Sequence, residues 1–194
     1  MLDNLRILVT RPSPQGDALC AAIKSLGAYP IHFPTIAFAP APDEELFQQS
    51  LQKLGEQDWL IFISPQSVYS SLAAIRQYWP HFPEMLQWAA VGEGTARALR
   101  QAGYEVNLYP GRENSEGLLD LPEFQQVKGK KIAIIRGAGG RELIDRVLTE
   151  RGAQVLSVIA YERILPRVNV DDYLKCLEEH AIDMIVCTSF EGGA

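Results

Sequence analysis

The sequence has few cysteines, few histidines and no long apolar run. Its three cysteines are far apart and form no C-x-x-C pair, which argues against a disulfide framework or a zinc site. The three histidines lack the i, i+4 spacing of a helical metal pair. No stretch approaches the roughly 18 consecutive apolar residues of a membrane-spanning helix, and the run near the N-terminus is too short for a secretion signal. These absences predict a protein of the reducing cytoplasm.

Basic residues are also scarce. The 18 Lys and Arg residues are outnumbered by 24 Asp and Glu residues, the net charge is -6, and no cluster of basic residues occurs. A protein that grips a nucleic-acid backbone or an anionic membrane surface needs such a cluster. We therefore expect neither nucleic acid nor membrane as a partner.

Several common catalytic motifs are missing too. The segment GAGGRE (137–142) has the first two glycines of G-x-G-x-x-G, but Glu142 stands at the third. There is no P-loop, no G-x-S-x-G turn and no evident Cys/His pair. Conventional nucleophilic catalysis is not indicated.

Apolar strands alternate with amphipathic helices along the chain. The expected strands are 5–11, 58–64, 86–92, 104–110, 130–136 and 183–189, and the expected helices are 17–27, 68–78, 93–103 and 141–152. Continuous apolar strands in this alternation call for parallel sheets covered on both faces. The sequence therefore predicts an α/β fold of the doubly wound kind.

A constant offset of 125 residues relates two parts of the chain. The identical pairs are Arg11 and Arg136, Gly27 and Gly152, Ala28 and Ala153, Asp58 and Asp183, and Ser64 and Ser189. They fall at equivalent junctions, namely strand ends, helix ends and strand starts, which favours an internal duplication. The two Asp residues precede strands and are interpreted as turn residues rather than acids.

The second copy stops early. After Ser189 only five residues follow, whereas the first copy continues through further strands and helices, so about 45 residues are missing by comparison. We expect the chain to be a fragment or a truncated product whose first domain is incomplete. Two extended connectors, 34–42 and 154–166, stand at equivalent places in the two copies and suggest a hinge with a cleft.

In open α/β sheets, ligands bind beyond the carboxyl ends of the strands, where helix N-termini point. The residues at those ends that are suited to an anion are Arg11, Ser64, Thr95, Arg136, Gly137, Gly139, Gly140, Thr188 and Ser189. Each has a structural explanation as well, because glycines permit tight turns, hydroxyl residues cap helices and arginines form structural ion pairs. Tyr161 lies in the second connector and is either a wall residue or a proton donor.

Six segments in this order carry a family resemblance: ILVTRPSPQG, FISPQSV, AVGEGTARAL, IIRGAGGREL, AYER and VCTS. The chain from Ile7 to Ser189 resembles the uroporphyrinogen-III synthase family. The resemblance implies two α/β domains joined by a two-stranded connector. Residues 1–33 with 167–194 would form a discontinuous first domain, and 43–153 the second.

The resemblance also implies a reaction. Linear hydroxymethylbilane, a substrate with eight carboxylates, would be closed to uroporphyrinogen III with loss of water and inversion of ring D through a spiro intermediate. No metal or redox cofactor is implied. Tyr161 would assist departure of the hydroxyl. Backbone and hydroxyl groups would hold carboxylates at Ser64, Thr95, Gly137 to Gly140, Thr188 and Ser189. A monomer is expected, with transient contact to the preceding enzyme of the pathway.

The chain departs from the family pattern in places. Many members read F-T-S-x-N-A-V where this chain has FISPQSV (62–68), so of that motif only Ser64 carries over. After Ser189 the segment Phe190-Glu-Gly also differs from the family pattern. The residues alone support only a two-lobed anion-binding protein, and the reaction comes from the resemblance. The alternative is therefore a non-catalytic two-lobed α/β module that closes on a small polycarboxylate or other anion.

Overall fold

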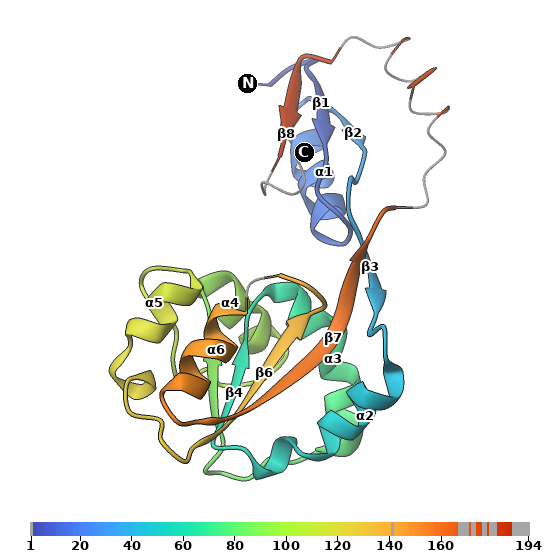
Figure 1. Cartoon of the computed structure of the whole chain (residues 1–194). Coiled ribbons are helices and arrows are strands. Elements are labelled where there is room, and N and C mark those ends of the chain that lie inside the picture. Colours follow the sequence, from blue (N-terminus) through green and yellow to red (C-terminus); the bar gives the residue numbers. More distant parts are fainter. Residues whose placement is uncertain are drawn as a thin grey trace. The chain divides into compact units, whose positions relative to one another are not determined.

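The computed structural model describes residues 2–140, 142–166, 171, 174–175, 178 and 182–187. The chain divides into two compact units (Figure 1). Unit 1 comprises Met1–Phe38 and Arg163–Ala194, and unit 2 comprises Ala39–Glu162. Both contain parallel strands and helices, so the predicted two-domain α/β fold is confirmed.

Unit 1 contains a small parallel sheet in the order β2-β1-β8. Its elements are β1 (Arg6–Val9), α1 (Gln15–Ser25), β2 (Tyr29–His32) and β8 (Met184–Val186). Ile7 and Val9 of β1 are buried against Ile23 of α1. Pro30 lies on the edge strand β2, as a residue without a backbone N–H must.

Unit 2 contains a larger sheet in the order β3-β7-β6-β4-β5. Its strands are β3 (Ala37–Pro40), β4 (Trp59–Phe62), β5 (Gln87–Ala90), β6 (Lys131–Gly137) and β7 (Gln154–Ile164). Its helices are α2 (Glu44–Gln52), η1 (Leu54–Glu56), α3 (Pro65–Tyr78), α4 (Glu93–Gln101), α5 (Ser115–Asp120), η2 (Pro122–Phe124) and α6 (Leu143–Glu150). The four strands β4 to β7 are parallel.

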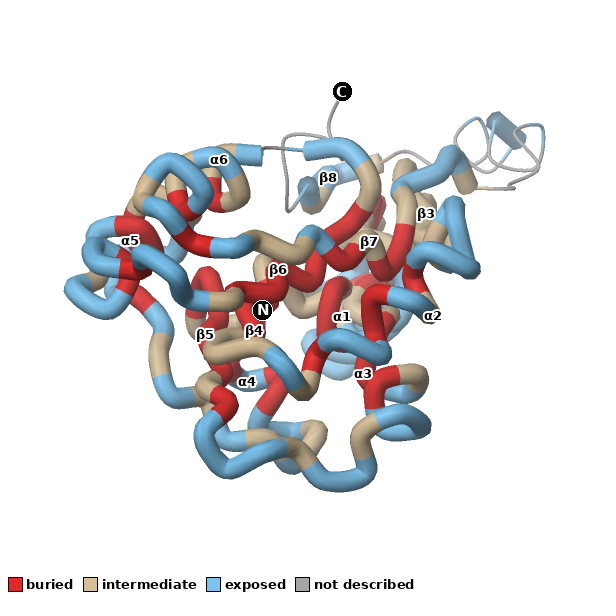
Figure 2. Tube along the Cα trace, turned by 60° about the horizontal axis from the view of Figure 1, so that its bottom comes forward, coloured by how far each residue is buried: buried red, intermediate tan, exposed pale blue. Residues whose placement is uncertain are grey.

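Helices cover the sheet of unit 2 so that its central strands are buried (Figure 2). Ile132 and Ile134 of β6 pack in one cluster with Leu118 of α5 and with Ile144 and Leu148 of α6. Side chains of a strand point alternately to the two faces of the sheet, so the residues of β6 that alternate with Ile132 and Ile134 face the opposite side. On that side helix α3 contacts β4 and β6. The sheet is therefore covered on both sides, as its apolar strands require.

Helix α3 shows how the local sequence sets these elements. Ser64 is its N-cap and Pro65 occupies the first turn, where a missing N–H costs nothing. Val68, Leu72 and Ile75 recur at helical spacing and are buried. The helix ends at Tyr78, and the indole N–H of the C-cap residue Trp79 donates to the Leu51 carbonyl at 2.7 Å.

The prediction of a strand over 104–110 is wrong. Only an isolated bridge between Ala89 and Leu108 forms there. The Asn107 side chain explains the loss, because its Oδ1 accepts the Trp88 N–H at 2.7 Å and so replaces a backbone partner. The sequence interpretation also missed α2 and α5, which are short helices capped by Asp43 and Asn114.

The two connector segments pair with each other as β3 and β7. The boundaries between the units fall within these strands rather than at their ends. Strands are also exchanged between the two copies. Strand β1 of the first copy pairs with β8 of the second, and β6 of the second copy pairs with β4 of the first. This is the exchange that a duplication with crossed connectors produces.

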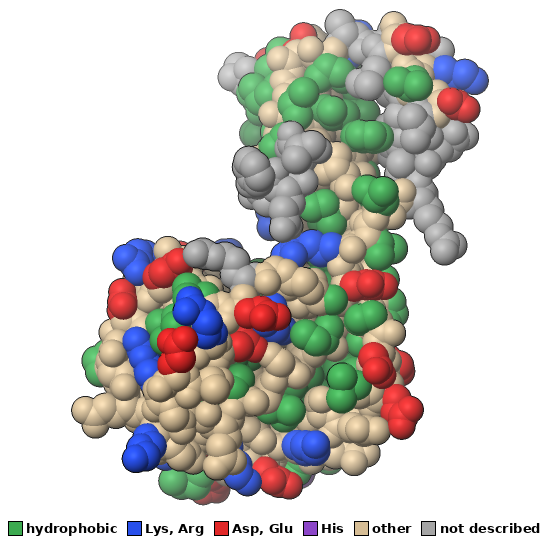
Figure 3. All heavy atoms as spheres, in the orientation of Figure 1, with side chains coloured by type: hydrophobic (Ala, Val, Ile, Leu, Met, Phe, Trp, Pro, Cys, Tyr) green, Lys and Arg blue, Asp and Glu red, His purple; other side chains and the backbone are tan. Residues whose placement is uncertain are grey.

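Three observations on the described residues are relevant to possible partners. No helix in the described part of the chain is both long and apolar enough to cross a bilayer. Lys and Arg side chains are interspersed with Asp and Glu on the face of unit 2 drawn in Figure 3, without a stripe of one sign. Cys20 and Cys187 are free thiols.

Candidate active site

The carboxyl ends of the parallel strands of unit 2 meet at one edge of the sheet. Ser64 follows β4, Gly92 follows β5, and Gly137 is the last residue of β6. Helices α3 and α4 begin directly after Ser64 and Gly92, so their N-termini lie at this edge. Backbone N–H groups and the positive ends of helix dipoles are thereby collected where a polyanion can bind.

Ser64 is held in place by a reciprocal capping box. Its Oγ accepts the Ser67 N–H at 3.1 Å, and its own N–H donates to the Ser67 Oγ at 3.3 Å. The Ser67 hydroxyl in turn donates to the Ser64 carbonyl at 2.7 Å. The hydroxyl of Ser64 is therefore fixed, and it lies 3.2 Å from the Tyr161 hydroxyl.

Tyr161 reaches this position because of a β-bulge. Arg136 pairs with Ile159, but Gly137 pairs with Tyr161, so β7 carries one extra residue at that point. Tyr161 is 1% exposed, and a Cβ at position 137 would lie 2.6 Å from its ring. Only glycine fits at 137 beside this ring.

Arg136, expected at a strand end, is a buried residue with 3% exposure. Its guanidinium forms an ion pair with Asp145 at 3.0 Å and donates to the carbonyls of Gly139 (3.2 Å) and Gly140 (3.4 Å). Both glycines have positive φ, 67° and 88°, which suits residues without a side chain. The guanidinium thus holds the Gly137–Gly140 turn from the inside.

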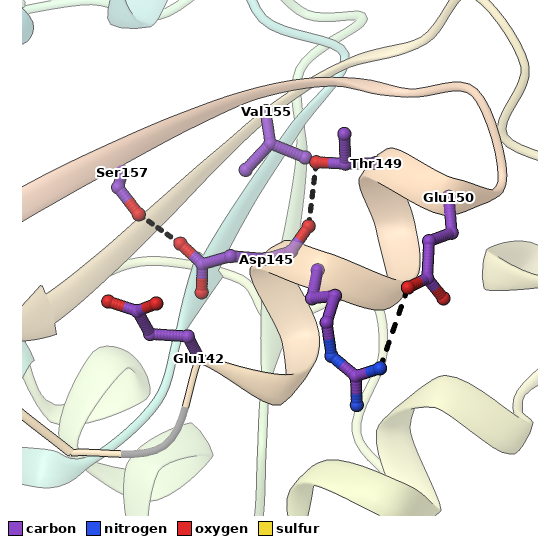
Figure 4. Close-up of a pocket in the computed structure, with 7 residues that line it drawn as sticks. Glu142, Asp145, Thr149, Glu150, Val155 and Ser157 are labelled. Atoms are coloured by element: carbon purple, nitrogen blue, oxygen red, sulfur yellow. Dashed lines mark hydrogen bonds and ion pairs between the residues drawn. The ribbon is translucent and has the colours of Figure 1, made fainter.

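Asp145 connects this turn to β7. The Ser157 hydroxyl donates to the carboxylate oxygen that does not face Arg136 (Figure 4). Sequence reasoning missed both residues, because nothing local links Arg136 to a carboxylate nine residues later. The sequence did offer one signal for such a partner, namely the charge of Arg136 in an apolar strand, because a buried arginine needs an anion.

A cavity of about 520 Å³ borders this network, between α6 and β7 (Figure 4). Its lining residues are Glu142, Asp145, Arg146, Thr149, Glu150, Val155 and Ser157. Three carboxylates against one guanidinium make it a poor place for a polyanion. The carboxyl ends of the strands therefore remain the candidate anion site.

The N-terminus of α4 already holds a carboxylate. Glu113 accepts the Glu93 N–H at 3.0 Å, and a Cβ at Gly92 would lie 2.6 Å from the Glu113 Oε2. Glu113 was not predicted. Thr95 lies in the first turn of α4 and is 4% exposed.

The remaining candidates belong to unit 1. Arg11 follows β1 and is half-buried, and its carbonyl accepts from the His32 Nε2 at 2.8 Å. The other ring nitrogen of His32 is 3.5 Å from Asp17. Thr188 and Ser189 lie outside the described residues. Across the described ranges, no group of three or more His, Cys, Asp or Glu residues is arranged to hold a metal ion.

Comparison with known proteins gives a consistent family. The family model "Uroporphyrinogen-III synthase HemD" matches residues 17–192. The chain is 38% identical over 188 residues to uroporphyrinogen-III synthase of Escherichia coli K12, covering 96% of this chain and 76% of that protein. It is 34% identical to the Salmonella typhimurium enzyme with the same coverage.

Solved structures show the same fold. A mutant uroporphyrinogen III synthase of Thermus thermophilus superposes with a TM-score of 0.65 at 22% identity, over 93% of this chain and 71% of that one. The Helicobacter pylori 26695 protein gives a TM-score of 0.57 at 15% identity, over 97% and 75% of the two chains.

Proposed function

The chain belongs to the uroporphyrinogen-III synthase family, and from that membership we propose that it closes linear hydroxymethylbilane to uroporphyrinogen III. The observation that carries the proposal is the family match over 17–192, together with 38% identity to the Escherichia coli enzyme. The reaction releases water and inverts ring D. Nothing found supports the alternative of a binding module without activity.

We propose that the carboxylates of the substrate bind at the strand ends. The N-terminus of α3 at Ser64 and the turn formed by Gly137, Gly139 and Gly140 offer backbone donors in unit 2. Thr188 and Ser189 keep the binding role that the resemblance implies, and Arg11 keeps the one that its position at a strand end suggests. Thr95 keeps its proposed binding role. The Arg136 guanidinium is already engaged by Asp145 and by the carbonyls of Gly139 and Gly140, so we assign Arg136 to shaping the glycine turn.

Tyr161 is the proposed proton donor for loss of water. Its phenol O–H gives a proton to the oxygen of the substrate hydroxymethyl group, the C–O bond breaks, and water leaves with the bonding electron pair. The cation that remains is stabilised by the adjacent pyrrole nitrogen. Ring D then attacks through its substituted carbon, giving a spiro intermediate that fragments and recombines. The proton released on ring closure restores the phenol.

Orientation is the main task of such an enzyme. Hydroxymethylbilane closes by itself to the type I isomer, so the protein must hold the chain folded for attack at the substituted carbon. It must also keep water from the cationic intermediate. Anion-binding turns at several strand ends serve the first need, because each can fix one carboxylate of the substrate.

The setting we propose for this activity is a cytoplasmic monomer. It takes hydroxymethylbilane from the preceding enzyme of the pathway by transient contact. The mixed surface charge and the free thiols are in keeping with these proposals.

The test is a product assay. Purified protein is given fresh hydroxymethylbilane, the products are oxidised, and the type I and type III isomers are resolved by chromatography. We expect type III in excess. Type I alone, with the bilane held tightly and released unreacted, would favour the binding module instead.

A further inference from the structure

The Tyr161 hydroxyl is fixed from two sides, by Ser64 and by Gly137. We infer that Ser64 is a positioning residue for the loss of water, acting through the Tyr161 hydroxyl rather than on a substrate carboxylate. The inference rests on the function proposed above and deepens it.

The capping box determines what the Ser64 hydroxyl can do. As N-cap, its Oγ accepts the Ser67 N–H at 3.1 Å, which leaves its single O–H proton for another partner. The Ser64 carbonyl is engaged by the Ser67 hydroxyl. Tyr161 Oη lies 3.2 Å from the Ser64 Oγ, and in the arrangement we propose it accepts the Ser64 proton.

Gly137 fixes the other side of the ring. A Cβ at this position would lie 2.6 Å from Cε2 and Cζ of Tyr161 and 3.1 Å from its Oη. The hydroxyl end of the ring therefore lies over the glycine backbone. The bulge in β7 brings Tyr161 opposite Gly137, and the Tyr161 carbonyl accepts the Ala138 N–H at 2.7 Å. Ring and backbone are both anchored.

This arrangement has a chemical consequence. When the phenol gives its proton to the departing hydroxyl, negative charge develops on Oη. A hydrogen bond from Ser64 and the positive end of the 14-residue helix α3 both stabilise that charge without moving. The phenolate keeps its Ser64 partner until ring closure returns a proton.

The first test is kinetic. Ser64→Ala is expected to lower kcat about fivefold or more, with KM within about twofold, since one neutral hydrogen bond is lost in the transition state. Ser64→Thr keeps the hydroxyl and the cap and should restore most of kcat. Ser64→Gly also removes the hydroxyl, but glycine is an accepted N-cap residue, so this variant reports on chemistry even where Ser64→Ala folds poorly.

A double-mutant cycle separates the two possible roles of Ser64. In a Tyr161→Phe background, Ser64→Gly should cost nothing further, because the group on which it acts is gone. Asp43→Ala is the matched control, because it removes the side-chain cap of a different helix, α2, where the Asp43 carboxylate accepts the Leu46 N–H at 2.9 Å. It should keep the wild-type kcat.

A spectroscopic measurement needs no turnover. In protein labelled with ¹³Cζ-tyrosine, the Tyr161 signal is assigned by its absence in Tyr161→Phe. It should shift in Ser64→Gly and stay in place in Asp43→Ala. Equal losses of kcat from Ser64→Gly in the wild-type and Tyr161→Phe backgrounds, or an unshifted Tyr161 signal, would overturn the role of Ser64 while leaving the function standing. Type I product alone from the wild-type protein would overturn the function itself.

Discussion

The carboxylate of Asp58 accepts the backbone N–H of Lys131 at 2.8 Å, while the Asp58 N–H donates to the Lys131 carbonyl at 2.8 Å. The same pair of bonds recurs in unit 1, where Asp183 takes the place of Asp58 and Arg6 that of Lys131, at 2.7 and 3.0 Å. Residues 58 and 183 are 125 apart, and so are 6 and 131. The duplication seen in the sequence is thus repeated in the hydrogen bonds that start these strands, and both acids serve as structural residues.

Asp58→Ala should therefore weaken unit 2. The substitution removes a charge-assisted bond to the first residue of β6, and we expect a loss of about 1–3 kcal/mol in the free energy of unfolding. Urea unfolding of the full chain measures it. Asp120→Ala is the control, because its pair with Arg112 is exposed and should contribute less than about 1 kcal/mol. Equal losses from the two variants would contradict the account.

Asp145→Asn should be far more damaging. It leaves the Arg136 guanidinium buried at 3% exposure without its anion, and removal of one partner from a buried pair costs about 3–5 kcal/mol. Chemical denaturation is the measurement. Glu150→Gln on the same helix breaks only an exposed pair with Arg146 and should cost about 0.5 kcal/mol or less. A mild Asp145→Asn variant would mean that the carbonyls of the glycine turn are sufficient partners for Arg136.

Glu113→Ala should free the N-terminus of α4. Glu113 is exposed, and its carboxylate at a helix N-terminus is expected to contribute about 0.3–1 kcal/mol at low salt, less as salt is added. Thermal unfolding at two ionic strengths measures this. Glu105→Ala, another exposed acid of unit 2, is the control and should show no such salt-dependent loss. A loss from Glu113→Ala that does not vary with salt would rule out the electrostatic explanation.

Tyr161→Phe should lower turnover severalfold or more with little change in KM, because it removes a proton donor but keeps the ring packed over Gly137. Steady-state kinetics with hydroxymethylbilane provide the measurement. The type III isomer should still prevail among the enzymatic products, since folding of the substrate is unaffected. Wild-type turnover in this variant would end the proposal that Tyr161 donates the proton.

The sequence predicted most of the framework. Apolar strands alternating with helices indicated the α/β fold, and the identities at Gly27 and Gly152 pointed to equivalent helix ends, where both glycines have positive φ of 84° and 87°. These features are local, or repeat at one offset, and can be recognised without coordinates. The exchange of strands between copies followed from the family resemblance.

What the sequence could not predict depends on contacts between distant residues. The Asn107 side chain replaces a backbone partner of Trp88 and ends a strand that the apolar pattern favoured. The Arg136 side chain is buried because it forms an ion pair with Asp145 and hydrogen bonds with two backbone carbonyls there. The approach of Tyr161 to Ser64 depends on a bulge of one residue, which no spacing in the sequence reveals.

The most direct test of the central claim is the isomer composition as a function of protein concentration. Hydroxymethylbilane is divided among samples with increasing amounts of the purified chain, the reaction is run to completion, and the oxidised porphyrins are resolved. Spontaneous closure competes with the enzyme, so the type III fraction should rise from near zero toward the whole product as protein is added. A product that stays type I at every concentration would contradict the assignment of this chain as a uroporphyrinogen-III synthase.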